Sequence, residues 1–176
     1  ILMKYIVKFF VITFLLLSST YASAEQNIAF MNMAKVLNDS KAGKGAQDYL
    51  QSQFKKGQKK FTDLENKLKK EESDLLAKKT ILTKEEYKKK SDTLRDNVVK
   101  YQNDRRKSLD TIAQKRAQAR LDLLNKLTPL VEAYTVENNI LIILDSKNVI
   151  AGNPELDITK TIIEKLNKEL PSLNLK

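Results

Sequence analysis

The chain contains no cysteine, no histidine and no tryptophan, and only four of its 176 residues are glycine. Without cysteine no disulfide bond can brace the fold, and without cysteine and histidine the usual zinc sites cannot form. The same absences exclude the Ser-His and Cys-His pairs that activate a nucleophile. Glycine occurs only at positions 43, 45, 57 and 152, a spacing that matches no phosphate-binding loop. We therefore expect a protein that is not an enzyme and that has no metal site and no other cofactor.

Acidic residues do not restore a catalytic site. The clearest carboxylate pairs, Glu71-Glu72 and Glu85-Glu86, lie in lysine-rich helical sequence, where neighbouring charges are typical of a solvated helix face. Binding is therefore the kind of function that the composition favours.

The long apolar run of the chain is confined to its first residues. Lys4 and Lys8 precede or flank an apolar stretch at 9–17, and the small residues Ala22-Ser23-Ala24 follow it. This order predicts a cleavable secretory signal peptide over residues 1–24. An uncleaved membrane anchor is the alternative, but the run is shorter than the about 20 apolar residues that a spanning helix needs. We expect the mature chain to begin at Glu25 and to work in an export compartment, where ATP is usually lacking.

Residues 41–127 have the apolar spacing of two long helices, and we call the apolar positions the seam. In the first half these positions advance in steps of four and three, as in a heptad repeat with two interruptions: Leu50, Phe54, Gly57, Phe61, Leu64, Leu68, Glu71 and Leu75. In the second half the series lapses over 102–108, between two groups: Tyr87, Leu94, Val98 and Tyr101, then Leu109, Ile112, Ala113, Ala117, Leu123, Leu124 and Leu127.

A short turn joins the two predicted helices. Thr83 and Glu86 have the spacing of a capping box, in which each side chain bonds the other residue's backbone amide, so the second helix is predicted to begin there. Long helices joined by few residues fold back on each other, which predicts an antiparallel hairpin arm over residues 41–127. Pro129 lacks the donor for a helical hydrogen bond, so we expect a bend and a hinge at Pro129, with Thr128 capping a restarted helix.

The residues on either side of the arm predict a small head that contains strands. Segments 27–33, 140–144 and 149–151 are predicted strands, the second one buried and the third returning after a turn at 145–148. Asp157 is predicted to cap a last helix. A head of residues 25–40 and 128–176 is too small to be stable alone without a disulfide or a metal, so we expect it to form oligomers. The residues predicted to form the oligomerisation surface are Ile28, Phe30, Ile140, Ile142, Leu144 and Val149.

The expected fold class is therefore α+β and mainly α, with a small β-containing head and a long helical hairpin. Positive charge is concentrated in the arm, because residues 41–126 contain 24 basic and 13 acidic side chains, whereas the rest of the expected mature chain contains 6 and 9. Such an excess attracts acidic partners at long range, although lysines on a long helix are also typical of a plain solvated face. The predicted binding residues are Lys55, Lys56, Lys59, Lys60, Lys69, Lys70, Lys88, Lys89, Lys90, Arg105, Arg106 and Lys107.

The arm also contains four aromatic side chains. Phe54, Phe61, Tyr87 and Tyr101 occupy seam positions, so we expect them to pack between the helices rather than to contact a ligand. Because the seam is thin, we also expect some of their surface to remain available to apolar segments of another protein.

Several short motifs, taken in their order, resemble the Skp/OmpH family of periplasmic chaperones. They are Asn-Ile-Ala-Phe-Met-Asn-Met at 27–33, the basic hairpin, Ile-Leu-Ile-Ile-Leu-Asp at 140–145, Val-Ile-Ala at 149–151 and Asp-Ile-Thr at 157–159. The resemblance covers essentially the whole expected mature chain. It implies a jellyfish-shaped homotrimer, in which the strands build a trimerisation head and three arms enclose a cavity.

The resemblance also implies a function. Members of the family bind unfolded outer-membrane proteins in the periplasm and keep them soluble, without ATP, until they are inserted. The implied partners are unfolded outer-membrane proteins and copies of the chain itself, and some members also bind anionic lipid or lipopolysaccharide. No lipopolysaccharide motif is evident in this sequence, and no nucleic acid is expected as a partner.

Two other functions are consistent with parts of the sequence. A polyanion or nucleic-acid binder would explain the basic arm, but the predicted signal peptide argues against nucleic acid. A structural coiled-coil scaffold in the cell envelope would explain the hairpin, but a scaffold should have a continuous apolar seam. This seam lapses at Gly57, at Glu71 and over 102–108.

Overall fold

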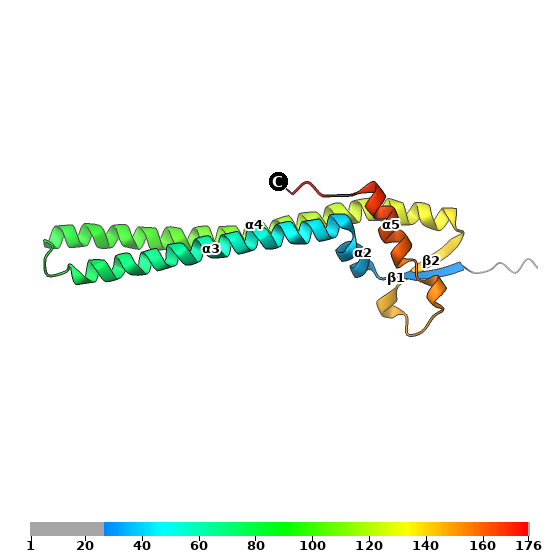
Figure 1. Cartoon of the computed structure of the whole chain (residues 1–176), viewed down its shortest axis with the longest axis horizontal. Helices are drawn as coiled ribbons and strands as arrows, with labels where there is room; N and C mark the ends of the chain where they lie inside the picture. Colours follow the sequence, from blue (N-terminus) through cyan, green and yellow to red (C-terminus); the bar gives the residue numbers. More distant parts are fainter. Residues whose placement is uncertain (1–26, 176) are drawn as a thin grey trace, which may run out of the picture.

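The computed structural model describes residues 27–175, and it confirms the predicted α+β, mainly helical fold. The elements are β1 (Asn27–Met31), α2 (Met33–Asp39), α3 (Lys41–Ala77), α4 (Lys84–Glu137), β2 (Ile140–Asp145), the 3-10 turns Ser146–Asn148 and Pro154–Leu156, and α5 (Thr159–Glu169). Figure 1 shows α3 and α4 side by side in a long hairpin, with the other elements gathered at one end. We call residues 41–127 the arm and the other described residues the head. The predicted signal peptide, 1–24, lies outside the described residues.

No helix between residues 27 and 175 combines the length and the apolar character that a membrane crossing requires.

The corner between α2 and α3 depends on Ser40 and Gly43. The Ser40 side chain is fully buried, and its hydroxyl accepts a hydrogen bond from the Gly43 amide at 3.1 Å, so it caps α3. A Cβ atom at Gly43 would lie 1.8 Å from the carbonyl oxygen of Leu37, which no other residue could tolerate. Glycine at this position therefore lets α3 leave the head at a sharp angle to α2.

The predicted capping box at the start of α4 is confirmed. The Thr83 amide donates to Oε2 of Glu86 at 3.0 Å, and the Glu86 amide donates to the Thr83 hydroxyl at 3.2 Å. The hydrogen bond from the Thr83 amide lowers the pKa of Glu86 below its ordinary value. The turn of the hairpin thus ends at Thr83. The capping box that fixes this end involves only residues within one helical turn.

The predicted helix restart at Pro129 is wrong, because α4 continues without a break to Glu137. The Thr128 hydroxyl donates back to the carbonyl oxygen of Leu124 at 3.0 Å instead of capping a new helix. Leu127 and Leu130 on either side of the proline are both buried in the core of the head. Their packing holds the helix together across a residue that removes one backbone hydrogen bond. A hinge at Pro129 stays a prediction.

The two strands are parallel neighbours, and the predicted returning strand at 149–151 is wrong. Ile28 pairs with Ile142 and Phe30 pairs with Leu144, while 149–151 lies outside any strand. The Asp145 carboxylate accepts a hydrogen bond from the Lys147 amide at 3.1 Å and turns the chain away from β2. The chain then comes back on the other side of β1, where the Ile158 amide donates to the carbonyl oxygen of Phe30 at 3.0 Å.

The apolar core of the head joins α2, α4 and α5 beneath the sheet. Its buried members come from elements far apart in the sequence: Ala29, Met31, Val36, Leu37, Ala42, Leu123, Leu127, Leu130, Ile158, Ile162 and Leu166. Asp157 lies one residue before the helical cap rather than at it, yet its carboxylate still accepts from the Thr159 amide at 2.9 Å and from the Thr159 hydroxyl. The Asn32 amide donates to the same hydroxyl at 2.9 Å, which ties the start of α2 to the start of α5.

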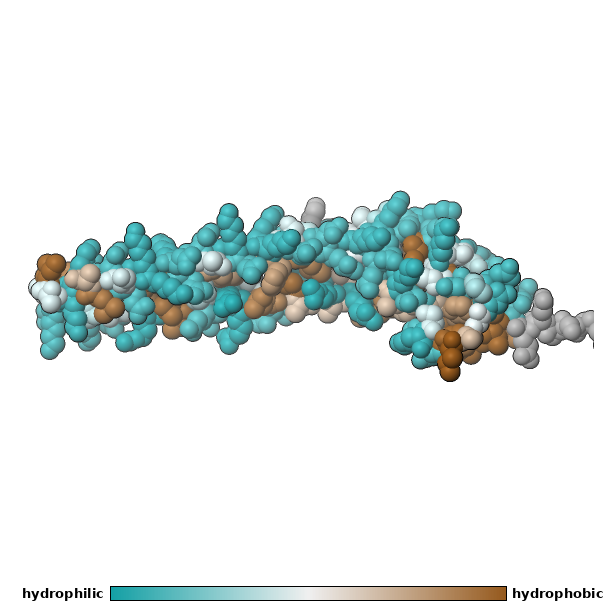
Figure 2. All heavy atoms as spheres, turned by 60° about the horizontal axis from the view of Figure 1, so that its bottom comes forward, coloured by the Kyte–Doolittle hydropathy of each residue, from teal (hydrophilic) through white to brown (hydrophobic). Residues whose placement is uncertain are grey.

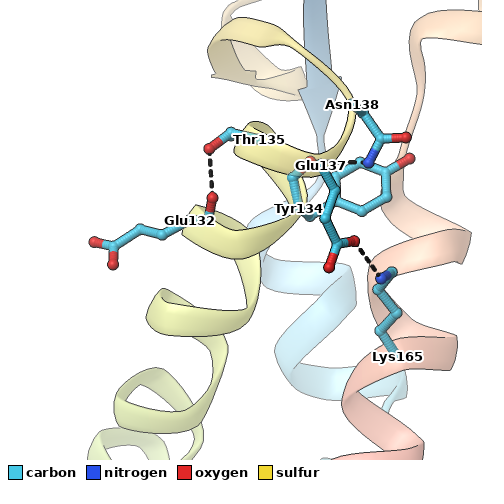
Figure 3. Close-up of polar contacts among 6 residues, drawn as sticks. All are labelled: Glu132, Tyr134, Thr135, Glu137, Asn138 and Lys165. Atoms are coloured by element: carbon cyan, nitrogen blue, oxygen red, sulfur yellow. Dashed lines mark hydrogen bonds and ion pairs between the residues drawn. The ribbon is translucent and has the colours of Figure 1, made fainter.

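The C-terminal end of α4 is tied to α5 by side chains (Figure 3). The Lys165 ammonium lies 3.0 Å from Oε2 of Glu137 and 5.3 Å from the centre of the Tyr134 ring. Asn138 donates to the carbonyl oxygen of Tyr134 at 2.9 Å, and Asn139 has a φ of 51°, a left-handed conformation that ends the helix before β2. The base of the arm is therefore connected to the head through both its core and its surface.

After α5 the chain runs back along the arm (Figure 1). Leu173 packs against the core of the head, and the carbonyl oxygen of Leu175 accepts from the Lys115 ammonium at 3.3 Å. The same ammonium lies 3.4 Å from the Tyr49 hydroxyl and 5.4 Å from the centre of that ring. Lys115 thus bridges α3, α4 and the segment that follows α5.

Candidate binding surfaces of the arm and the head

The seam of the arm buries side chains singly rather than as a continuous core. On α3, the buried seam positions are widely spaced: Leu50, Phe61, Leu68 and Leu75. Phe54 remains 44% exposed, and Leu109 on α4 remains 47% exposed. Figure 2 shows apolar side chains at intervals along the arm, separated by polar ones. The expectation that a thin seam leaves apolar and aromatic surface accessible is confirmed for Phe54.

Two of the three lapses of the seam face each other in the middle of the arm. A Cβ atom at Gly57 would lie 3.4 Å from the Ser108 hydroxyl, so the interruption on α3 meets the lapse at 102–108 on α4. A hollow of about 360 Å³ opens there, and we call it the mid-arm groove. Its lining is mostly apolar and aromatic, with polar residues at the edges: Phe54, Gly57, Gln58, Phe61, Thr62, Glu65, Tyr101, Arg105, Ser108, Leu109 and Ile112.

A small polar network fixes one side of the mid-arm groove. The Tyr101 hydroxyl donates to Oε2 of Glu65 at 3.1 Å, and Lys69 lies 2.7 Å from Oε1 of the same carboxylate. The hydrogen bonds from Lys69 and Tyr101 hold the pKa of Glu65 below its ordinary value, so this group stays ionised at neutral pH. The rings of Phe61 and Tyr101 meet edge to face, with their centres 6.0 Å apart.

All twelve basic residues predicted for binding are exposed on the arm. Three of them have partners within the chain: Lys69 pairs with Glu65, Arg106 donates to Asn103, and Lys60 lies 5.6 Å from the centre of the Phe61 ring. Lys89 and Lys90 border a second hollow near the hairpin turn, which is lined largely by charged side chains. Contact between these twelve basic residues and a partner stays a prediction.

The hairpin turn carries an apolar feature that sequence reasoning missed. Ile81 is 80% exposed at the far end of the arm, and Leu76 close to it is also exposed. The sequence could have indicated this exposure. Ile81 lies between Lys79 and Lys84 in the predicted turn, where it belongs to neither series of seam positions.

The head exposes apolar side chains around its small sheet. Of the six residues predicted for oligomerisation, Ile28, Ile142 and Leu144 are exposed, while Phe30, Ile140 and Val149 are half-buried. The prediction that β2 is a buried strand is wrong for the single chain, because none of its residues is buried and Leu141 is 73% exposed. Sequence reasoning also missed further exposed apolar residues of the head: Val136, Leu141, Ile150 and Leu156.

A parallel sheet with an exposed face is unusual, because parallel sheets are normally covered on both sides. In the described part of the chain, β2 pairs only with β1, so its other edge presents unpaired backbone groups. The head therefore has an open strand edge next to exposed isoleucine and leucine side chains.

Known proteins share this architecture. The family model described as outer membrane protein (OmpH-like) matches residues 27–166. A Skp-like protein of Chlamydia pneumoniae is 28% identical over 169 residues, a match that covers 92% of this chain and 96% of that protein. A crystal structure from Caulobacter crescentus, provisionally described as an outer membrane chaperone (OmpH-like), matches with a TM-score of 0.79 at 18% identity and covers 89% of this chain and 93% of that one. At that identity the structural match shows the fold, and the family model shows the membership: the chain belongs to the OmpH-like family of outer membrane proteins, as its motifs predicted.

Proposed function

We propose that this protein is a periplasmic holding chaperone, which binds unfolded outer-membrane proteins without ATP and prevents their aggregation before insertion. Membership of the OmpH-like family supports a chaperone role. The signal peptide predicted at 1–24 supports export. The lack of histidine and cysteine, which leaves the chain without the common nucleophile pairs, favours binding over chemistry.

The proposed assembly is a homotrimer formed through a head of residues 25–40 and 128–176, with the arms of residues 41–127 around a shared cavity. The open edge of β2 and the exposed Leu141 and Ile142 support association of the head with copies of itself. Fully burying one such side chain contributes about 1.5–3 kcal/mol, so a few of them are enough to stabilise a head that is small for an independent domain. The Skp/OmpH resemblance supports three copies.

The observation that carries the proposal is the combination of a thin seam with a strongly basic surface on the arm. Exposed apolar side chains such as Phe54 and Leu109 offer contacts to an unfolded chain, and the lysines around them attract acidic segments from a distance. Lysine stems can also cover apolar client surface while their charges stay in water. Several such weak contacts, held together on arms of one assembly, bind tightly in sum although each can be exchanged. A client would leave when its own folding or insertion is more favourable.

Dilution of a urea-unfolded outer-membrane β-barrel protein into buffer without ATP tests the proposal by light scattering. We expect the mature protein to suppress aggregation at one trimer per client, and high salt to slow client capture because it screens exposed charges. A variant with Lys88, Lys89 and Lys90 changed to glutamate should capture the client more slowly. The matched control changes three exposed head lysines, Lys35, Lys160 and Lys168, to glutamate. Full aggregation with the wild-type protein at the stoichiometric ratio would refute the proposal.

Anionic membrane lipid or lipopolysaccharide is a second proposed partner, supported by the exposed Ile81 among the lysines of the hairpin turn. Vesicle flotation with anionic and with neutral lipid tests it. We expect binding to the anionic vesicles only, and weaker binding for Ile81→Ser. Equal flotation of wild type and variant would exclude a role for this side chain.

A further inference from the structure

The mid-arm groove has the size of a side-chain site. An apolar cavity of about 150 Å³ in a protein is large enough to hold benzene. The groove of about 360 Å³ therefore has room for one aromatic side chain and part of the backbone that carries it. Gly57 and Ser108 form its floor, and without a side chain at Gly57 the two helices leave this space empty.

The walls of the groove are suited to an aromatic or branched apolar group. Phe54 and Leu109 line it with nearly half of their surfaces accessible to solvent, and Phe61 and Tyr101 present an edge-to-face pair. A third ring can extend such an arrangement at 4.5–7 Å between centres, as aromatic groups prefer. By contrast, the hollow near the hairpin turn is lined by Glu71, Asp74, Glu86 and several lysines, and no aromatic side chain lines it.

The charge around the groove determines which kind of residue can stand next to the apolar one in a bound segment. Glu65 is ionised, and its negative charge is compensated by Lys69 and by the hydrogen bond from the Tyr101 hydroxyl. Arg105 borders the groove, and no acidic residue of the described chain forms an ion pair with it. Its guanidinium can therefore bind a carboxylate with two parallel hydrogen bonds.

From this arrangement we infer that the mid-arm groove is a binding site for an extended segment of an unfolded protein, in which an aromatic side chain stands next to an acidic one. The ring enters between Phe54 and Leu109, and the carboxylate meets Arg105. This inference rests on the proposed holding function and names the part of the arm that performs it. The bound segment is released when its ring and its carboxylate leave the groove, and no other event is needed.

Two glycines of α3 provide a matched test. In Gly57→Ala the new methyl group raises the floor of the groove at an ordinary contact distance of 3.4 Å from the Ser108 hydroxyl. In Gly45→Ala the methyl group meets nothing within 4 Å. Both changes favour the helix and should raise the unfolding midpoint. Only Gly57→Ala should weaken peptide binding, so misfolding cannot explain a loss.

The probes are fluorescent, unstructured nine-residue peptides with Trp-Asp, Trp-Lys or Ala-Asp at the centre, titrated by anisotropy against the full mature protein. We expect the Trp-Asp peptide to bind about fivefold more tightly than the Ala-Asp peptide. This is the gain in affinity expected when an aromatic side chain becomes partly buried. Phe54→Ala and Gly57→Ala should reduce this preference, while Gly45→Ala keeps it. Arg105→Gln should remove only the preference of about twofold to fivefold for Trp-Asp over Trp-Lys, as expected for a solvent-exposed ion pair.

Three outcomes would overturn the inference. The first is equal binding of Trp-Asp and Ala-Asp, and the second is equal effects of the two glycine variants. The third is a lower assembly mass for Phe54→Ala in sedimentation, which would show that another copy of the chain covers the groove. If the wild-type protein still prevents client aggregation in these cases, the holding function stands and only the groove assignment fails. Groove-dependent peptide binding without suppression of aggregation would refute the holding function instead.

Discussion

The head and the arm use apolar side chains in opposite ways. The head concentrates fully buried residues such as Leu127, Ile162 and Leu166 in one core, yet it leaves Leu141 and Ile142 exposed around an open strand edge. The arm has no such core, and on α3 its seam buries one side chain about every two to three turns between exposed lysines. The difference teaches that the head combines a packed core with accessible apolar side chains at its sheet, as the proposed association requires, whereas the arm depends on helix formation and leaves most of its side chains exposed.

The largest effect is expected from truncating the core of the head. Leu127 is only 1% exposed, and Leu127→Ala should lower the free energy of unfolding by about 3–4 kcal/mol through lost burial and a cavity. The same truncation in the seam, Leu68→Ala, should cost about 2 kcal/mol or less, because neighbouring helices can close around the gap. Urea unfolding followed by circular dichroism, at one protein concentration, measures both. Equal losses would show that the arm is packed like the head.

A charge at an exposed side chain of β2 should weaken the proposed association of the heads. Ile142→Asp and Leu141→Asp would place an unpaired carboxylate in the proposed interface, and we expect association to weaken about a hundredfold. Analytical ultracentrifugation should then show a lower mass at micromolar concentration. The control is Ile81→Asp, which puts the same charge on an exposed side chain at the other end of the molecule. An unchanged mass for both β2 variants would place the interface elsewhere.

Pro129 lies where the arm meets the head, and its replacement tests whether the two regions move independently. Pro129→Ala should restore the hydrogen bond to the carbonyl oxygen of Asn125 and stabilise α4 by about 1–2 kcal/mol, after allowance for a more flexible unfolded chain. We expect a stiffer arm base and a narrower range of accepted client sizes. Spin-label distances between arms measure the spread, and indistinguishable distributions for the two proteins would rule out a hinge at this residue.

The smallest effect is expected at the hairpin turn, far from the head. Thr83→Ala removes the cap of α4 and should cost about 1 kcal/mol, seen as earlier hydrogen exchange in the first turn of this helix. Because hydrogen bonding lowers the pKa of Glu86 in the folded state, its contribution is complete above pH 4.5 and is lost as the pH falls through the folded value. Exchange in the head should not change. An equal increase in head and arm would mean that the two regions unfold together.

Local signals in the sequence predicted the arm well. The capping box at Thr83 and Glu86 is confirmed because both partners lie within one helical turn and need nothing else from the fold. Half of the predicted seam positions on α3 are buried, namely Leu50, Phe61, Leu68 and Leu75, because heptad spacing places them on one face of a helix, whereas Phe54 stays exposed. All three lapses of the seam, at Gly57, at Glu71 and over 102–108, were visible in the sequence as well. That Gly57 meets Ser108 was not, because it depends on the register of two antiparallel helices.

The errors lie in the head, where contacts are distant in sequence. Residues 149–151 have the composition of a strand, but β2 already pairs with β1 in parallel, and the turn at Asp145 leads the chain away. Pro129 normally ends a helix, but the burial of Leu127 and Leu130 on both sides keeps α4 intact. In both cases a local preference of about 1–3 kcal/mol is outweighed by packing that the sequence does not reveal.

By itself the sequence determined the family, the lack of histidine and cysteine chemistry, the two long helices and the concentration of positive charge on them. These properties follow from composition, helical periodicity and capping, which act within a few residues along the chain. Only the tertiary structure decided the parallel pairing of the strands, the continuous helix through Pro129 and the hollow between Gly57 and Ser108. Each of these depends on which distant side chains share one volume, and packing settles that question only when the whole chain is folded.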